Sequence, residues 1–283
     1  MSKGGKGYTV IEVLIFIAVS SLMFITAMIA INGRQQQVQF SQGTREFDAK
    51  IRDIINDVTT GYYPANDTVS CQVVASEVQI EASTGQTIGT NSECIYIGKV
   101  LQFNLNGVSD SFKIYNLAGK RFVGDDLTPT LSIDEAAPKA VTMIADGSFV
   151  DPSENFLIPY GLKVTKVISP QSDTVYSEYG AIAIVSNFGG SSVSEGQSVQ
   201  IGGIVGSQFG ASESDAVGVI NSLTQLENNN VDNIGYMDIN RSQGIVICLE
   251  SSHGSVASIT LGKNGSSDTE LQLDNHIAGC DNV

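Results

Sequence analysis

Few side chains in this sequence have the type and spacing needed for chemistry. The 283 residues include two histidines, His253 and His276, and neither stands at the spacing of a nucleophile with its base or of a metal motif. Carboxylates and asparagines gather at 125–126, 134–135, 151–154 and 228–232, but none of these groups follows the order of an EF-hand calcium loop. No glycine cluster carries the lysine and hydroxyl residue of a phosphate-binding loop. The sequence therefore predicts no enzyme and no cofactor, and it indicates a structural or binding protein.

The cysteines indicate disulfides. There are four, Cys71, Cys94, Cys248 and Cys280, and no C-x-x-C spacing or cysteine–histidine cluster suggests zinc or a redox motif. Three pairings are possible. We favour Cys71–Cys94 and Cys248–Cys280, because each pair joins adjacent strand–loop elements and closes a loop that stabilises by about 3 to 4 kcal/mol in the chain-entropy model. Free buried cysteines are the alternative.

One carboxylate stands out by its position. Glu12 directly precedes Val13–Ile31, a run of nineteen residues without a charge, which as a helix would measure about 28 Å, close to the hydrocarbon thickness of a bilayer. The run is longer than the apolar core of a secretory signal and ends without a small-x-small cleavage site. Lys3 and Lys6 precede it and Arg34 follows it, which favours a cytoplasmic N-terminus. Glu12 is costly at the edge of a lipid-facing helix unless it finds a partner or reaches the headgroup layer.

These residues carry a family resemblance. The basic leader, the segment from Gly7 to Ile15 and the apolar run together resemble the prepilin leader and core of type IV pilins and of type II secretion pseudopilins. The resemblance implies that a prepilin peptidase cuts after Gly7, that Tyr8 becomes the N-methylated first residue, and that Glu12 pairs with the N-terminal amine of a neighbouring subunit. Tyr8 stands where the family usually has phenylalanine. A single buried polar group has precedent as a register pin in helical assemblies, which supports this role for Glu12 on physical grounds.

The same resemblance implies a life cycle. The chain would be a single-pass protein of the cytoplasmic membrane before assembly and part of an extracellular fibre at the cell surface afterwards. Its partners would be copies of itself and other pilins, the prepilin peptidase, and an assembly platform with its ATPase. As a major or minor pilin it would serve adhesion, motility or DNA uptake. The alternatives are a type II secretion pseudopilin and a surface binding protein on a plain membrane anchor that never assembles.

The helix that begins in the membrane is expected to continue beyond it. A polar sequence with an apolar stripe at helical spacing follows the run, which predicts one helix over 8–60 with a membrane or fibre-core part at 8–31 and an amphipathic part at 34–60. The stripe consists of Phe40, Phe47, Ile51, Ile54, Ile55 and Val58. Charged residues, Asp48 among them, occupy the other faces, and Gly33 and Gly43 are expected soft points. Gly61 and Pro64 predict the helix end, and the leader is residues 1–7.

Residues 61–283 predict a β-rich head. Short apolar or alternating runs between Gly, Asn, Ser and Asp clusters are typical of strands. The expected strands are 71–75, 77–81, 94–105, 112–117, 140–144, 162–168, 179–185, 199–205, 245–249, 255–261 and 269–273. A helix capped near Ser212 is expected through Val217, Ile220, Leu223 and Leu226. The predicted fold class is α+β, a long N-terminal helix packed on a β-rich, pilin-like head.

Charge limits the range of partners. The formal net charge is −15, and it becomes −17 once Lys3 and Lys6 leave with the leader. Residues 167–283 carry thirteen acidic residues against Arg241 and Lys263, so this acidic C-terminal half is expected not to bind nucleic acid. The bases that could form a basic patch, or lie scattered over the head, are Lys113, Lys120, Arg121 and Lys163.

Overall fold

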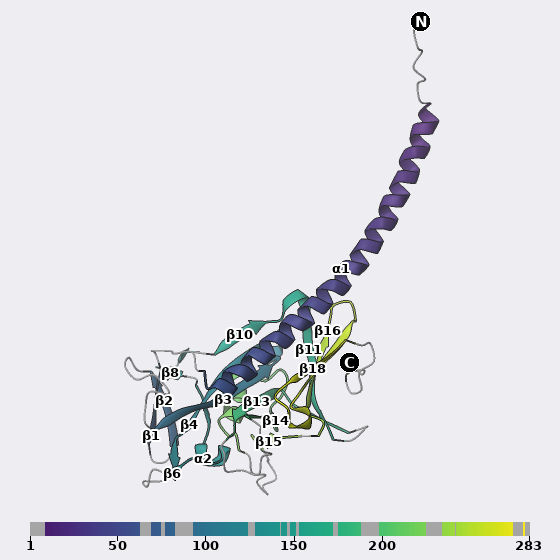
Figure 1. Ribbon diagram of the computed structural model, residues 1–283. Helices are drawn as coiled ribbons and strands as arrows, with labels where there is room; N and C mark the ends of the chain where they lie inside the picture. The colour runs from purple at the N-terminus through teal and green to yellow at the C-terminus, as the bar shows by residue number, and fades with distance from the viewer. Residues whose placement is uncertain are drawn as a thin grey trace. The chain divides into compact units, whose positions relative to one another are not determined.

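The computed structural model shows an α+β protein with one long apolar helix and a β-rich body (Figure 1). It describes residues 9–62, 69–74, 77–82, 93–123, 128–141, 143–145, 148–150, 153–171, 175–187, 198–224, 234–240, 242–273 and 280. Helix α1 spans Val10–Thr60. The chain divides into two compact units, residues 1–42 and 43–283. We call residues 10–42 the N-terminal segment of α1 and residues 43–60 its docked half, because the boundary falls within the helix and the docked half belongs to the body.

The centre of the body is a seven-stranded antiparallel sheet (Figure 1). Its strands follow the order β10, β4, β3, β13, β14 and β15, and β7 also pairs with β4. Their bounds are β3 Cys94–Phe103, β4 Ser111–Lys120, β7 Lys139–Ala140, β10 Glu154–Leu157, β13 Ala181–Ser186, β14 Val199–Ile204 and β15 Met237–Asp238. The three inner strands β3, β4 and β13 are buried on nearly every residue, so both faces of this sheet are covered.

A five-stranded antiparallel sheet and three small ribbons complete the described strands. The five-stranded sheet has the order β12, β11, β16, β17 and β18. Its bounds are β11 Lys163–Pro170, β12 Tyr176–Glu178, β16 Ile245–Glu250, β17 Val256–Leu261 and β18 Thr269–Leu273. The ribbons pair β1 Val69–Val74 with β2 Glu77–Ala82, β5 Phe122–Val123 with β6 Thr128–Pro129, and β8 Met143–Ala145 with β9 Ser148–Val150.

Alternation along β4 places different helices on the two faces of the large sheet. Phe112 contacts Phe47 of α1, with ring centroids 5.5 Å apart. The next residue, Lys113, points to the opposite face, where its Nζ lies 2.5 Å from Glu213 of α3 (Glu213–Ile220). The short helix α2 (Ile133–Ala136) packs into the same core cluster as α3. The large sheet is therefore sandwiched between the docked half of α1 and a layer formed by α2 and α3.

The docked half buries five of the six residues of the stripe that the sequence predicted. Phe47, Ile51, Ile54, Ile55 and Val58 are all at most 5% exposed. The sixth, Phe40, belongs to the N-terminal segment and is half-buried.

Two residues of the docked half make contacts that the sequence does not predict. Asp48, expected on a face away from the apolar stripe, is 9% exposed and accepts a hydrogen bond from Thr269 Oγ1, because β18 approaches that side of the helix. The sequence predicts soft points at Gly33 and Gly43, and the helix continues through both. At Gly43 the helix packs closely on the body, since an added Cβ would lie 2.8 Å from Leu162 Cδ1 and 3.1 Å from Tyr160 Cδ2, and the ends of these two side chains would have to move.

Both disulfides that the sequence favoured are present. Cys71 and Cys94 are bonded with Cα atoms 6.1 Å apart, and Cys248 and Cys280 with Cα atoms 5.7 Å apart. All four residues are at most 3% exposed. The first disulfide ties β1 to the start of β3, and the second ties the C-terminal end of the chain to β16.

The remaining expectations differ from the structure mainly at element ends. Helix α3 stops at Ile220, although Leu223 beyond it is buried, and Leu226 lies outside the described residues. The strand expected at 140–144 is divided between β7 and β8. The edge strands β10, β12 and β15 were not predicted.

Candidate membrane and assembly segment

The N-terminal segment of α1 exposes a continuous apolar surface. Its large apolar side chains between Val10 and Ile31 are 45% to 79% exposed. An 18-residue window in this helix has a mean hydropathy of 2.6 and no buried residue. Among the residues that the structure describes, α1 is the one helix long and apolar enough to cross a membrane. A surface of this kind needs lipid or other apolar helices around it.

Two polar side chains inside this apolar stretch are satisfied by the helix itself. Ser21 Oγ donates to the carbonyl of Ile17 at 2.7 Å, and Thr26 Oγ1 donates to the carbonyl of Met23 at 2.9 Å. These bonds to the preceding turn give both hydroxyls an acceptor within the helix. Both side chains are therefore compatible with a hydrocarbon environment.

Glu12 lies at the start of the helix and forms a reciprocal cap with Thr9. The Glu12 carboxylate accepts from Thr9 N at 2.9 Å and from Thr9 Oγ1 at 3.1 Å. In return, Glu12 N donates to Thr9 Oγ1 at 3.3 Å. This is a capping box, in which two helix-end donors are satisfied by two side chains. The carboxylate thus has partners within its own chain.

This cap was missed in the sequence, although its signal was present. Thr9-Val10-Ile11-Glu12 has the spacing of a capping box ahead of an apolar run. The two predicted processing residues, Gly7 and Tyr8, lie outside the described residues.

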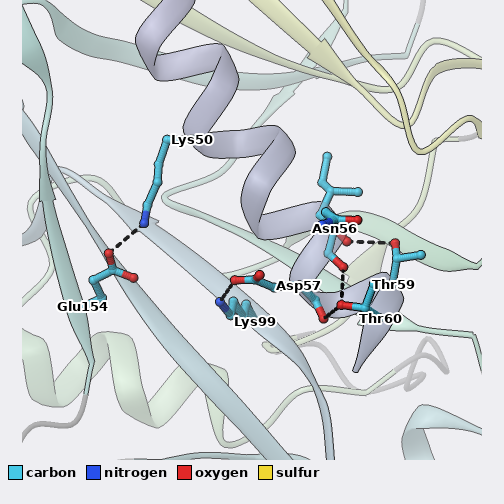
Figure 2. A network of polar contacts seen from close by, with 8 residues as sticks. Lys50, Asn56, Asp57, Thr59, Thr60, Lys99 and Glu154 are labelled. Carbon is cyan, nitrogen blue, oxygen red and sulfur yellow. Dashed lines mark hydrogen bonds and ion pairs between the residues drawn. The ribbon is translucent and has the colours of Figure 1, made fainter. Parts of the chain in front are cut away.

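Polar contacts hold the docked half to the body on several sides (Figure 2). Lys50 Nζ lies 2.7 Å from Glu154 Oε1 on β10, and Lys99 Nζ on β3 lies 2.6 Å from Asp57 Oδ2. On the side of β18, Arg52 donates to the carbonyl of Thr269 at 2.8 Å. The helix end is tightened by its own threonines, since Thr60 Oγ1 donates to the carbonyl of Asn56 at 2.9 Å.

The other candidate residues do not come together as a site. Lys113 pairs with Glu213 beneath α3, so its charge does not contribute to an exposed basic patch. Glu135 is occupied in capping α2, where it accepts from Leu131 N at 2.7 Å. His253 lies on an exposed turn, and His276 falls outside the described residues. Within the described ranges, no three histidine, cysteine or acidic side chains gather as a metal site.

Among the residues that the structure describes, Tyr179 has the most strongly shifted pKa, and its contacts are structural. Tyr179 is 2% exposed and its hydroxyl donates to Asp238 Oδ2, joining the segment before β13 to β15. Burial raises the pKa of Tyr179 well above its usual value, and the hydrogen bond to Asp238 acts in the same direction. The tyrosine ring occupies the space that a Cβ on Gly203 would fill. This contact explains Gly203 as a packing position, and its neighbour Gly202 is limited instead by Met237 and the carbonyl of Asp238 on β15.

No protein-family model, no curated protein and no solved structure matches the chain. A functional conclusion therefore depends on the sequence and on the contacts of α1 described above.

Proposed function

We propose that this chain is a structural subunit of a type IV pilus-like fibre. It would be inserted in the cytoplasmic membrane through the N-terminal segment of α1, cleaved after Gly7, and assembled into a helical fibre at the cell surface. Copies of itself and other pilins would be its partners in the fibre, and a prepilin peptidase and an assembly platform with its ATPase would act on it beforehand. The body would lie on the fibre surface and carry the adhesive, motility or DNA-uptake role.

The observation that carries the proposal is the single helix with two environments. Residues 10–31 expose every large apolar side chain, whereas residues 47–58 bury theirs in a disulfide-bonded body. The same helix could therefore lie in a membrane first and in a bundle of identical helices later, since both surround its apolar surface with apolar groups. A head-to-tail repetition of that bundle would grow into a fibre rather than a closed ring.

The Thr9–Glu12 cap favours a second candidate, the non-assembling surface protein on a plain anchor. Because Thr9 already satisfies the carboxylate, Glu12 does not need a neighbouring subunit to be tolerated near the membrane. Under the pilin proposal, the same carboxylate would exchange or share these contacts with the amine of an incoming subunit. The two candidates therefore assign different partners to one side chain.

The N-terminus of the mature protein tests processing. Mass spectrometry of protein recovered from the cell surface should find N-methylated Tyr8 as the first residue. An intact Met1 on surface-exposed protein would refute the pilin proposal and support the plain anchor.

Replacement of Glu12 by glutamine separates the two roles of the side chain. Glutamine retains the capping-box geometry but removes the charge, so Glu12→Gln should leave membrane insertion and cleavage intact. Loss of a charge-assisted hydrogen bond should lower fibre yield by about ten- to hundredfold. Thr9→Val is the matched control, since it removes the capping hydroxyl and leaves the charge, and its fibre yield should stay within about threefold of the parent. Normal fibre yield from Glu12→Gln would show that Glu12 is only a cap.

A further inference from the structure

Three side chains that can react with one another gather beneath the docked half of α1. Lys99 on β3 is 4% exposed. Its Nζ lies 2.6 Å from Oδ2 of Asp57, whose side chain is 31% exposed (Figure 2). Asn116 on β4 is the cross-strand partner of Lys99 and is 7% exposed. A primary amine, a carboxylate and a primary amide therefore share one largely buried place.

Asn116 stands on the same face of the large sheet as Lys99. Phe112 of β4 contacts Phe47 of α1, and side chains four residues apart along a strand share a face, so the amide of Asn116 also lies on the α1 side. The Cβ atoms of a cross-strand pair are about 4.5 to 5.5 Å apart, a separation that a lysine side chain can span. The amine can therefore reach the amide carbon without movement of either strand.

The amide of Asn116 is poorly satisfied. Its Oδ1 is buried, and no residue that the structure describes forms a hydrogen bond with it. A buried polar atom without a partner is unfavourable, and a chemical role of the group is one explanation for it. The neighbouring side chains Ile114, Ala118 and Ile184 are apolar and fully buried. Such surroundings disfavour separated charges, so they favour passage of a proton from the ammonium to the carboxylate.

We propose that Lys99 and Asn116 form an intramolecular isopeptide bond and that Asp57 transfers the protons. Asp57 takes a proton from the Lys99 ammonium, and the neutral amine attacks Cγ of Asn116. The Nζ–Cγ bond forms, Asp57 returns its proton to Nδ2, and the Cγ–Nδ2 bond breaks. The released ammonia takes one further proton from Nζ and leaves as ammonium. Asp57 ends as a carboxylate, and no other reactant is needed.

The bond would remove a buried charge and add a link that a reducing agent does not break. Loss of the Lys99 ammonium removes the cost of burying it, and the new amide keeps one N–H that can donate to Asp57. The link would join β3 to β4 in the same body that the disulfides Cys71–Cys94 and Cys248–Cys280 stabilise. This inference does not depend on fibre formation.

A second lysine of the same two strands offers a matched comparison. Lys113 lies 2.5 Å from Glu213, and its cross-strand partner is Gln102, whose Oε1 is also buried without a partner among the described residues. The amide nitrogen of Gln102, however, donates to the carbonyls of Phe103 and Gln208. Its departure would break both hydrogen bonds, so the bond is expected at Lys99 and not at Lys113.

Tryptic digestion of the reduced full-length protein, followed by mass spectrometry, tests the bond. Trypsin does not cut at an acylated lysine, so residues 53–113 should remain uncut at Lys99 and should be joined to residues 114–120, which contain Asn116. The joined product should be lighter than the two peptides together by one molecule of ammonia. The free 114–120 peptide should be absent from the digest.

Three variants identify the reacting groups. Lys99→Arg keeps a cation beside Asp57 and a trypsin site but removes the nucleophile, because arginine is not deprotonated in proteins, so the free 114–120 peptide should appear. Lys113→Arg is the matched control and should leave the joined product unchanged. Asp57→Asn retains both reacting groups and should also release the free peptide, and complete joining in this variant would refute the role of Asp57. A free 114–120 peptide in the parent digest, or a joined product in Lys99→Arg, would overturn the proposal.

Discussion

Identical phenylalanine-to-alanine changes on the two parts of α1 should affect different properties of the protein. Phe47 is fully buried and meets Phe112 edge to face at 5.5 Å and 76°. Removing a buried phenylalanine ring costs about 3 to 5 kcal/mol. For a unit of this size, 1 kcal/mol shifts the unfolding midpoint by roughly 2 to 4 °C. Phe47→Ala should therefore lower the midpoint of the body by about 10 °C.

Phe24→Ala is the matched control. Phe24 is 64% exposed and belongs to the other compact unit, so its loss should leave the melting of the body unchanged and instead weaken insertion into membranes or fibres. The assay is thermal unfolding of both variants in the same detergent, followed by near-ultraviolet circular dichroism, with vesicle flotation for membrane association. A Phe47→Ala midpoint within about 2 °C of the parent would refute the docking of residues 43–60 on the large sheet.

Two other predictions follow from single contacts. Burial raises the pKa of Tyr179 above its usual 10.0. On alkaline titration the tyrosine therefore loses its proton in the unfolded chain before it does so in the folded one. The stability that the protonated tyrosine contributes is complete below pH 10 and is lost as the pH rises above 10. Tyr179→Phe should therefore reduce the alkaline fall in the free energy of unfolding, and an unchanged slope would contradict the assignment. Gly43→Leu should destabilise the body by about 1 to 3 kcal/mol through overpacking, whereas Gly33→Leu, with no atom within 4 Å of its added Cβ, should leave it unchanged in urea titrations.

Sequence periodicity predicted the parts of the fold whose burial repeats along the chain. The stripe from Phe47 to Val58 and the apolar runs of β3 and β13 each bury a regular set of positions, so their elements were found. The strand β10 was not found, because its residues are mostly exposed and its strand state depends on pairing with β4, which is distant in sequence.

The end of α3 shows why spacing alone was misleading. Val217, Ile220 and Leu223 recur every third residue, and on an α-helix such a series moves steadily around the axis instead of following one face. The helix ends at Ile220, and Leu223 is buried by the turn after it. Burial of a residue was correctly predicted there, but helical structure was not.

Register was the property that the sequence left most open, although one residue signalled it. Lys99 interrupts the apolar run of β3, and a charge in such a strand predicts a partner across the core. The docked half carries four acidic residues, and periodicity does not say which of them meets the lysine. They are Glu46, Asp48, Asp53 and Asp57. That choice depends on where the helix lies along the sheet, which the packing of Phe47 on Phe112 and of the buried isoleucines decides. The helix and β3 are far apart in sequence, so only their positions in the folded body show that Asp57 is the carboxylate that meets Lys99.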